Sequence, residues 1–361
     1  MSIILYRRSF ISFICILLFF ITITAVNAQN IDNIQDDTIS HQNNSSYQIN
    51  TNADVKNTTL SSDKINKQQI REIKQNKKGG HDVSSYDELY NTIEDIKINS
   101  NENAETINLN PGNYNITKTI NWGNTTHTTK TLTINANNII LDGNKAYRFI
   151  TVTNGYTLHL ENITVNNCRA ENGSVIINHG NTTINNSNFT DNIIENSERY
   201  GSGMVIINTG CMNVTNSNFR NNTEYCNGGS SQQFGGGVAY NLGNMSYKSS
   251  NFTDNTGLTG GVNFNYGYML IVDCNFDRNK AIVNKTLKRG GEGGVNFNHG
   301  FSTMIIKSSN FTNNQARSGG VNHNTGNMTI ITSNFHGNSV TREGGVNYND
   351  KNSALIIQQS T

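Results

Sequence analysis

The sequence predicts an all-β protein, a right-handed parallel β-helix with a short N-terminal capping helix. The motif Asn-Phe-x-x-Asn occurs six times, and Gly-Gly-Val occurs five times in a regular order with it. Between these motifs, apolar and polar residues alternate in runs of three to five, which is typical of short strands. With 34% hydrophobic residues the chain could be disordered, but disorder would scatter the apolar residues, and here they recur.

The composition limits the classes of partner. Asn accounts for 65 of the 361 residues, while 27 Lys and Arg residues balance 26 Asp and Glu residues for a net charge of +1. A near-neutral chain without a basic stripe gives no electrostatic reason to bind nucleic acid. We therefore expect no nucleic-acid partner.

The first 28 residues have the pattern of a signal peptide. Arg7 and Arg8 precede an apolar run over residues 10–26, and Val26-Asn27-Ala28 fits a small-residue cleavage site. The run is slightly shorter than a comfortable membrane span of roughly 20 residues. We expect cleavage after residue 28, no membrane span in the mature chain, and a secreted or cell-surface location.

Residues 29–82 are rich in Asn, Ser, Gln and Lys and show almost no apolar periodicity. Such a segment buries too little surface to offset chain entropy, so we expect a disordered linker. A short helix should follow, with Ser84 or Ser85 as its cap and Leu89, Ile93 and Ile96 on one face. The β-helix is then expected over residues 83–361.

The repeats predict how the coils are built. The shortest repeat is 24 residues long and contains three recognisable short strands, each of which should pair in parallel with its copies about 4.8 Å away. The Phe of each Asn-Phe-x-x-Asn should stack in the core, and the turn Asn should hydrogen-bond to its copies. Gly-Gly should supply the tight bend, and parallel crossovers favour the right hand. The predicted core stack consists of Phe189, Phe219, Phe252, Phe276, Phe311 and Phe335.

Two cysteines can be placed by alignment of the coils. The residue before Asn-Phe is Ser187, Ser217, Ser250, Cys274, Ser309 or Ser333. Cys168 fits the same row one coil earlier, four coils from Cys274, which is too far for a disulfide. Both cysteines are expected to act as small core residues in place of Ser.

These paired motifs resemble the repeats of polymorphic outer-membrane proteins and, still more, the Asn/Thr-rich adhesin-like surface proteins of methanogenic archaea. The segment 107–143 is similar to the opening coils of the pectin-lyase-like superfamily. The resemblance covers roughly residues 84–361. It implies a pectin-lyase-like β-helix, and it leaves the chemistry open because that superfamily contains enzymes, adhesins and passive stalks.

The acidic residues do not form a convincing catalytic pair. Asp191 and Asp254 occur where other coils carry Asn, Arg or Gly, so we interpret them as turn residues. Asp273 and Asp277 lie close in sequence, and we expect no neighbouring acid in the adjoining coils. His179 and His299 repeat at a turn that holds Thr or Tyr elsewhere, which favours a structural role. We expect no catalytic residue, cofactor or metal.

Three insertions fall at one point of the repeat, between the turn Asn and the Gly-Gly bend: residues 193–202, 223–233 and 280–292. Insertions on one face of a solenoid often form its binding face, and drift in tolerant loops is an equal alternative. The candidate binding residues on that side are Tyr200, Tyr225, Phe234, Lys285, Lys288 and Arg289.

The expected function is a non-catalytic adhesin-like rod that displays loops to glycans or neighbouring cell surfaces. One alternative is a polysaccharide lyase or glycoside hydrolase, and another is a structural stalk or cell-wall spacer. About seventeen Asn-x-Ser/Thr sequons make some N-glycosylation plausible. The final residues align with the middle of a coil, so the β-helix is expected to be truncated at its C-terminus.

Overall fold

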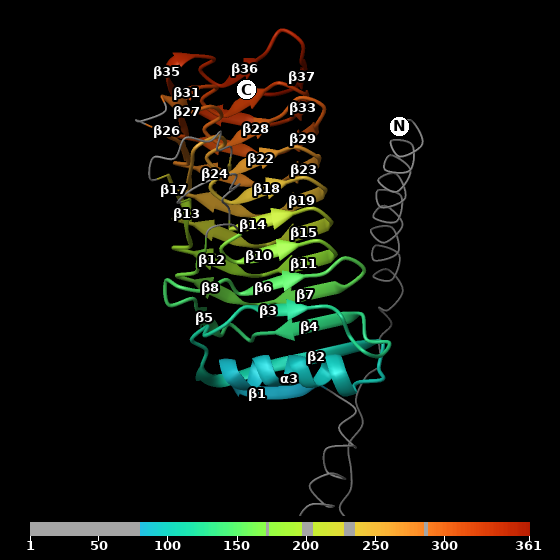
Figure 1. The fold of residues 1–361 in the computed structure, drawn as a ribbon. Helices are drawn as coiled ribbons and strands as arrows, with labels where there is room; N and C mark the ends of the chain where they lie inside the picture. Colours follow the sequence, from blue (N-terminus) through green and yellow to red (C-terminus); the bar gives the residue numbers. More distant parts are fainter. Residues whose placement is uncertain (1–79, 171–172, 197–204, 227–234, 285–287) are drawn as a thin grey trace, which may run out of the picture. The chain divides into compact units, whose positions relative to one another are not determined.

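The structure is a computed structural model that describes residues 80–170, 173–196, 205–226, 235–284 and 288–361. From residue 80 onward the chain winds into a β-solenoid of about ten turns (Figure 1). Four parallel sheets, which we name A to D and whose strands are given below, form its sides. A typical turn passes through them in the order C, A, B and D. The expected all-β parallel β-helix is confirmed.

Each strand pairs with its counterparts in the neighbouring turns. Sheet A contains β1 (His81–Ser85), β2 (Ala104–Asn113), β4 (Thr131–Asn135), β7 (Thr157–Glu161), β11 (Asn181–Asn185), β15 (Cys211–Thr215), β19 (Asn244–Lys248), β23 (Tyr268–Val272), β29 (Thr303–Lys307), β33 (Asn327–Ile331) and β37 (Ala354–Gln358). Sheet B contains β5 (Ile140–Asp142), β8 (Thr164–Asn166), β12 (Asn188–Thr190), β16 (Asn218–Arg220), β20 (Asn251–Thr253), β24 (Asn275–Asp277), β30 (Asn310–Thr312) and β34 (Asn334–His336).

The other two sheets complete the turn. Sheet C contains β3 (Ile120–Trp122), β6 (Ile150–Val152), β10 (Ile176–Asn178), β14 (Ile206–Asn208), β18 (Ala239–Asn241), β22 (Asn263–Asn265), β28 (Asn296–Asn298), β32 (Asn322–Asn324) and β36 (Asn347–Asn349). Sheet D contains β9 (Arg169–Ala170), β13 (Ile193–Asn196), β17 (Thr223–Cys226), β21 (Thr256–Gly257), β25 (Lys280–Ala281), β31 (Gln315–Ser318) and β35 (Ser339–Glu343). A small antiparallel hairpin joins β26 (Val283–Asn284) to β27 (Arg289–Gly290).

Helix α3 (Tyr86–Asn99) packs against β1 and β2 at the first turn (Figure 1). The Ser85 hydroxyl accepts a hydrogen bond from the Glu88 amide at 3.2 Å, so Ser85 is the N-cap. The predicted apolar face is buried at Leu89, Ile93 and Ile96. The helix therefore closes one end of the hydrophobic core, as the sequence predicts.

The strand content of a turn differs from the expectation in one respect. We expected three strands in each repeat, whereas sheet D adds a fourth. All three predicted insertions begin with strands of this sheet, β13, β17 and β25. In addition, β1 begins at His81, inside the segment predicted as linker. The predicted signal peptide and the linker up to residue 79 lie outside the described residues.

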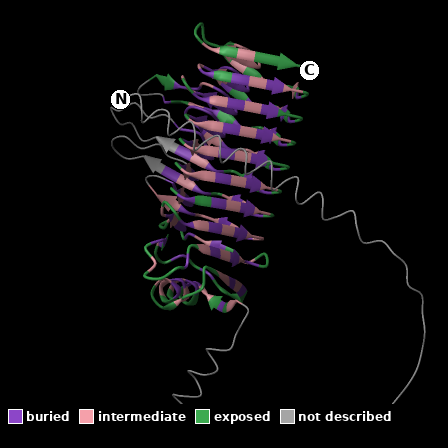
Figure 2. Cartoon of the chain, turned by 90° about the vertical axis from the view of Figure 1, so that its right-hand side faces the viewer, coloured by how far each residue is buried: buried purple, intermediate pink, exposed green. Residues whose placement is uncertain are grey.

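The predicted Phe stack runs through the core. Neighbouring rings from Phe189 to Phe335 are stacked with centroids 4.7–5.0 Å apart. The first five of these side chains are completely buried, and Phe335 is partly buried. Burying a Phe side chain contributes about 1.5–3 kcal/mol, so the stack is a major source of stability. Figure 2 shows the corresponding alternation of buried and less buried residues along the strands of the solenoid.

The Gly-Gly bend places two different demands on its glycines. The first glycine has a positive φ in several turns, for example +83° at Gly260 and +66° at Gly293, where other residues are strained. The second glycine is limited by space, because a Cβ on Gly261 would lie 2.0 Å from the Gly294 carbonyl oxygen. The predicted reason for the motif is confirmed, with close contact between turns as a further reason.

The predicted row of small core residues is correct for Cys274 and wrong for Cys168. Cys274 is buried, and its amide donates to the Ser309 hydroxyl at 3.1 Å. Strand β8 pairs with β12 so that Val165 lies opposite Phe189. This register places Cys168 beside the turn residue Asn192, to whose Oδ1 its amide donates at 3.0 Å. The coil that contains Cys168 lacks the Asn-Phe motif on which the alignment was based.

Candidate functional site: the polar corner between sheets B and D

A row of polar residues follows the strands of sheet B and forms a corner of the solenoid. Each residue of the row has a left-handed backbone conformation, which favours Gly, Asn and Asp. The row consists of Asp191, Asn221, Asp254, Arg278, Asn313 and Gly337, with φ angles from +52° to +65°. Asp191 and Asp254 therefore occupy turn positions, as predicted. We call this row, together with the strand-end residues beside it, the polar corner.

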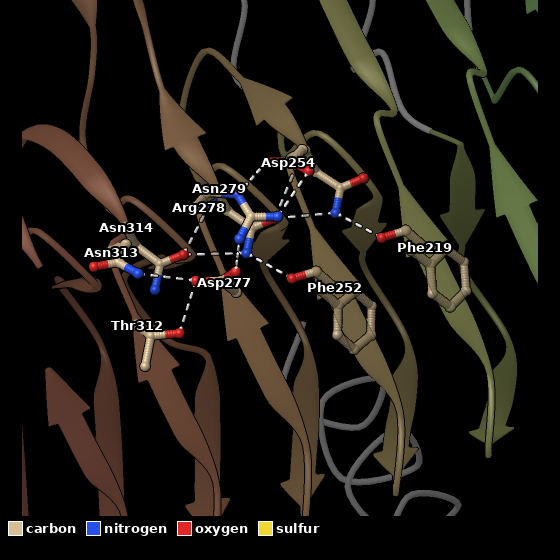
Figure 3. Close-up of polar contacts among 10 residues, drawn as sticks. Phe219, Phe252, Asp254, Asp277, Arg278, Asn279, Thr312, Asn313 and Asn314 are labelled. Carbon is tan, nitrogen blue, oxygen red and sulfur yellow. Dashed lines mark hydrogen bonds and ion pairs between the residues drawn. The ribbon is translucent and has the colours of Figure 1, made fainter. Parts of the chain in front are cut away.

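A ladder of Asn side chains, all buried except the partly buried Asn338, holds the turns together directly after this row. It consists of Asn192, Asn222, Asn255, Asn279, Asn314 and Asn338, each bonded through its side-chain amide to the next Oδ1 at 2.9–3.1 Å. The amide of Asn279 also donates to the Phe252 carbonyl oxygen, and that of Asn255 to the Phe219 carbonyl oxygen, both at 2.9 Å (Figure 3). These bonds satisfy buried polar groups that would otherwise be costly.

Arg278 is the centre of an ion-pair network in the polar corner (Figure 3). Its Nε and Nη2 donate to the two carboxylate oxygens of Asp254 at 2.8 and 3.1 Å, and it also contacts Asp277. Asp277 accepts hydrogen bonds from Thr312 at 2.8 Å and Asn313 at 3.2 Å. Hydrogen bonding to Asp254 and the charges of both carboxylates raise the pKa of Arg278. The network joins three consecutive turns.

This network corrects one expectation from the sequence. Asp277 was expected to have no acidic neighbour in the adjoining coils. Asp254 comes from the adjoining coil and shares the Arg278 guanidinium with it. The two acids occupy different positions of the repeat, Asp254 in the turn and Asp277 at the end of β24. A comparison of like positions along the sequence therefore misses the contact.

Next to this network lies a hollow of about 500 Å³, lined by Thr190, Asp191, Arg220, Asn221 and Asp254. Asn221 donates to an Asp191 carboxylate oxygen at 2.6 Å, and the exposed Arg220 ends β16 between the turns that carry the two acids. Carboxylates, an amide and a guanidinium are suited to hydrogen-bonding a hydroxylated ligand. Among the described residues, no three His, Cys, Asp or Glu side chains gather where they could hold a metal ion.

The two histidines singled out in the sequence contact the same turn position of a neighbouring coil. His179 Nδ1 lies 2.8 Å from the Thr209 hydroxyl. The His299 ring stacks on Tyr266 with centroids 4.5 Å apart, and burial lowers its pKa. Both contacts join adjacent turns, in agreement with the structural role expected for these residues.

The predicted binding loops are only partly described. Tyr200, Phe234 and Lys285 lie outside the described residues, and Tyr225 lies in β17. Lys288 and Arg289 are exposed in the β26–β27 hairpin. The three insertions were predicted to fall at one point of the repeat. They do begin at equivalent places, because β13, β17 and β25 all belong to sheet D.

Two other features were not found from the sequence. Glu224 in β17 is completely buried, and burial raises its pKa to about 8. Its Oε2 accepts a hydrogen bond from the Leu258 amide at 3.0 Å.

Several apolar side chains lie on the outward face of sheet A, where other strands carry Thr and Asn. The uniformly apolar segment Tyr268–Val272 was the available signal, since other strands of the sheet alternate.

No family model, curated protein or solved structure matches this chain. Within the described residues, no helix is both long and apolar enough to cross a membrane. The parallel β-solenoid and its Asn stacks are thus established from the geometry, which supports a rod-like or pectin-lyase-like scaffold.

Proposed function

We propose that this chain is the non-catalytic rod of an exported, adhesin-like surface protein that displays binding residues to glycans or neighbouring cell surfaces. The proposal rests on one observation, which is that polar side chains of the repeats form bonds between adjacent turns. The Asn ladders, Asp254 and Arg278 all bind the adjacent turn. Such bonds stiffen a rod, and they leave the insertions and the outward faces for recognition.

A structural spacer would need the same ladders, so the binding role depends on other features. The hollow beside Arg220 offers polar groups to solvent. The insertions start from one sheet, and Lys288 and Arg289 of the third insertion are exposed. Both features favour a rod that binds over a rod that only separates.

Binding of the purified full-length chain to a glycan array tests the proposal, with product release monitored with and without calcium. We expect saturable binding and no product. Unsaturated or reducing-end products would instead identify a polysaccharide lyase or hydrolase. Shortening the three insertions to the length of the 24-residue repeat separates the remaining alternatives, since a spacer has no binding to lose.

Export is a separate part of the proposal. The matching experiment expresses the full-length gene in a host with a secretion pathway and sequences the N-terminus of the protein outside the cell. A mature chain that begins at Gln29 would support the signal peptide. Retention of residues 1–28 in the cell-associated protein would contradict it.

A further inference from the structure

An apolar strip lies on the outward side of sheet A and on the turns that lead into it. Positions one, three and five of each strand face outward, as the burial pattern of β23 shows. Leu270 of β23 lies opposite Ile305 of β29, and both are outward residues. The strip consists of Leu242, Tyr266, Tyr268, Leu270, Phe301 and Ile305.

The turn residues of this strip are unusually exposed for apolar side chains. Leu242 is 43% exposed, Tyr266 is 46% exposed and Phe301 is 100% exposed. One face of the Tyr266 ring stacks on His299, which fixes the ring against the solenoid. Exposed aromatic and aliphatic groups gathered on one face mark a binding surface more often than single exposed residues do.

Two lysines border the strip at the last outward position of their strands. Lys248 ends β19 and Lys307 ends β29, with Val272 of β23 between them. Both lysines are exposed, and within the described part of the chain neither forms an ion pair with a carboxylate. Since they are two strands apart, their backbones are separated by about 10 Å. An acid lies near this pair: Asp273 follows Val272 in an exposed turn, and its backbone amide donates to the Lys307 carbonyl oxygen at 3.1 Å.

We propose that this surface binds an anionic polysaccharide that carries a carboxylate on every second sugar. The proposal rests on the proposed surface-binding function and names a ligand class and a site for it. An extended chain of pyranose rings advances per sugar by a length close to the strand spacing of about 4.8 Å. A chain lying along the solenoid axis therefore presents alternate sugars to Lys248 and Lys307.

The remaining groups of the surface match the other faces of such a ligand. The C–H face of a pyranose ring packs on apolar and aromatic side chains, here Leu270, Ile305 and Tyr268. The first outward position supplies Asn244, Thr303 and the exposed Asn327 for hydrogen bonds to sugar hydroxyls. An uncharged glycan would not use the lysines.

The test measures binding of the full-length chain to hyaluronan, in which uronic acid and hexosamine alternate. Polygalacturonate, with a carboxylate on every sugar, and neutral cello-oligosaccharides serve as comparisons. We expect saturable binding that is strongest for hyaluronan. The double change Lys248→Gln and Lys307→Gln should weaken it about tenfold and reduce its dependence on salt. Lys280→Gln is the matched control, because Lys280 is an exposed lysine of sheet D.

A second variant tests the apolar contact without altering charge. Leu270→Thr with Ile305→Thr places at these outward positions the residue found at Thr183 and Thr329 of the same row. We expect an unchanged urea midpoint and about tenfold weaker hyaluronan binding. Asp273→Asn should strengthen binding by removing a nearby negative charge.

Several outcomes would overturn the site. They are absence of hyaluronan binding, equal binding of neutral oligosaccharides, or binding that survives both the lysine and the threonine variants. Binding only to vesicles that contain phosphatidylserine would identify a membrane surface instead. A dimer in mass photometry that Leu270→Thr dissociates would show that a second copy covers the strip. Binding of other glycans on the array that survives these variants would leave the proposed function standing without this site.

Discussion

The outward face of sheet A differs between the early and the late turns, although the backbone repeat is the same. Strands β4, β7 and β11 present mainly hydroxyl and amide groups, whereas β23 presents Tyr268, Leu270 and Val272, and β29 presents Ile305 between Thr303 and Lys307. The early outward residues are Thr131, Thr133, Asn135, Thr157, His159, Glu161, Asn181, Thr183 and Asn185. Inward positions in the same strands are mostly apolar, with Leu132, Leu158 and Met269 as examples, and the inward hydroxyl of Thr182 donates to Asn178. Inward positions therefore specify the fold, and outward positions are free to specify binding.

The largest effect expected from this comparison is at an inward position. Phe252→Ala removes a buried ring that stacks on both Phe219 and Phe276. We expect a loss of about 3–5 kcal/mol in the free energy of unfolding, because the cavity cannot close between fixed turns. Urea unfolding followed by circular dichroism measures it. The outward change Leu270→Thr serves as the control, and equal losses for the two variants would contradict the comparison.

The next effect is expected at Glu224, a buried acid opposite Ile194 of the neighbouring turn. Burial raises the pKa of Glu224 to about 8 from an ordinary value of 4.5, so the folded state favours the protonated form. The unfolded chain ionises first, and the resulting stability is lost as pH rises from about 4.5 to about 8. Urea midpoints at pH 4.5, 6 and 8 should fall for the native chain relative to Glu224→Gln. Parallel pH profiles for the two proteins would show that Glu224 does not titrate in this range.

A smaller effect is expected where a polar ladder is buried. Asn255→Ala leaves the Phe219 carbonyl oxygen and the Asn222 amide without their partner. Unsatisfied buried groups cost about 1–3 kcal/mol, which urea unfolding measures. Asn251 belongs to a solvent-exposed Asn row, so Asn251→Ala should change the stability by less than about 0.5 kcal/mol. If Asn251→Ala lowered the free energy of unfolding as much as Asn255→Ala does, exposed and buried Asn rows would contribute equally to stability.

The smallest effect is expected in the polar corner. Arg278→Gln removes an exposed ion pair with Asp254, and water screens such pairs. The urea midpoint should move less than it does for Asn255→Ala, and adding salt to the native chain should have a similarly slight effect. A midpoint shift larger than that of Asn255→Ala would make the network a main support of the solenoid.

The sequence predicts features that recur and face inward. The stacked Phe residues and the Gly-Gly bends could be predicted, because each requires a particular residue type at a fixed spacing. The helix cap was narrowed only to Ser84 or Ser85, and the structure selects Ser85. Sheet D was not readable, since its buried row contains residues as different as Ile194, Glu224 and Ala281. Its strands are held by hydrogen bonds to neighbouring turns, and short strands of this kind leave no alternation in the sequence.

The candidate sites were harder to predict because they depend on differences between turns. Alignment of the repeats places Asp254 and Asp277 in separate columns, although Arg278 joins them across the turns. The apolar strip lies in the outward positions that an alignment of repeats treats as variable. A search for fully apolar strands among alternating ones would have identified Tyr268–Val272.

The position of α3 gives the solenoid a direction of assembly. The helix contacts β1 and β2 and closes the hydrophobic core at that end of the solenoid. Each later turn offers the unpaired backbone groups of its strands only to the turn that follows it in the chain. The first turn can thus act as a template while the polypeptide is still being made. Growth then proceeds by addition at a single end, in the order in which the ribosome supplies the repeats.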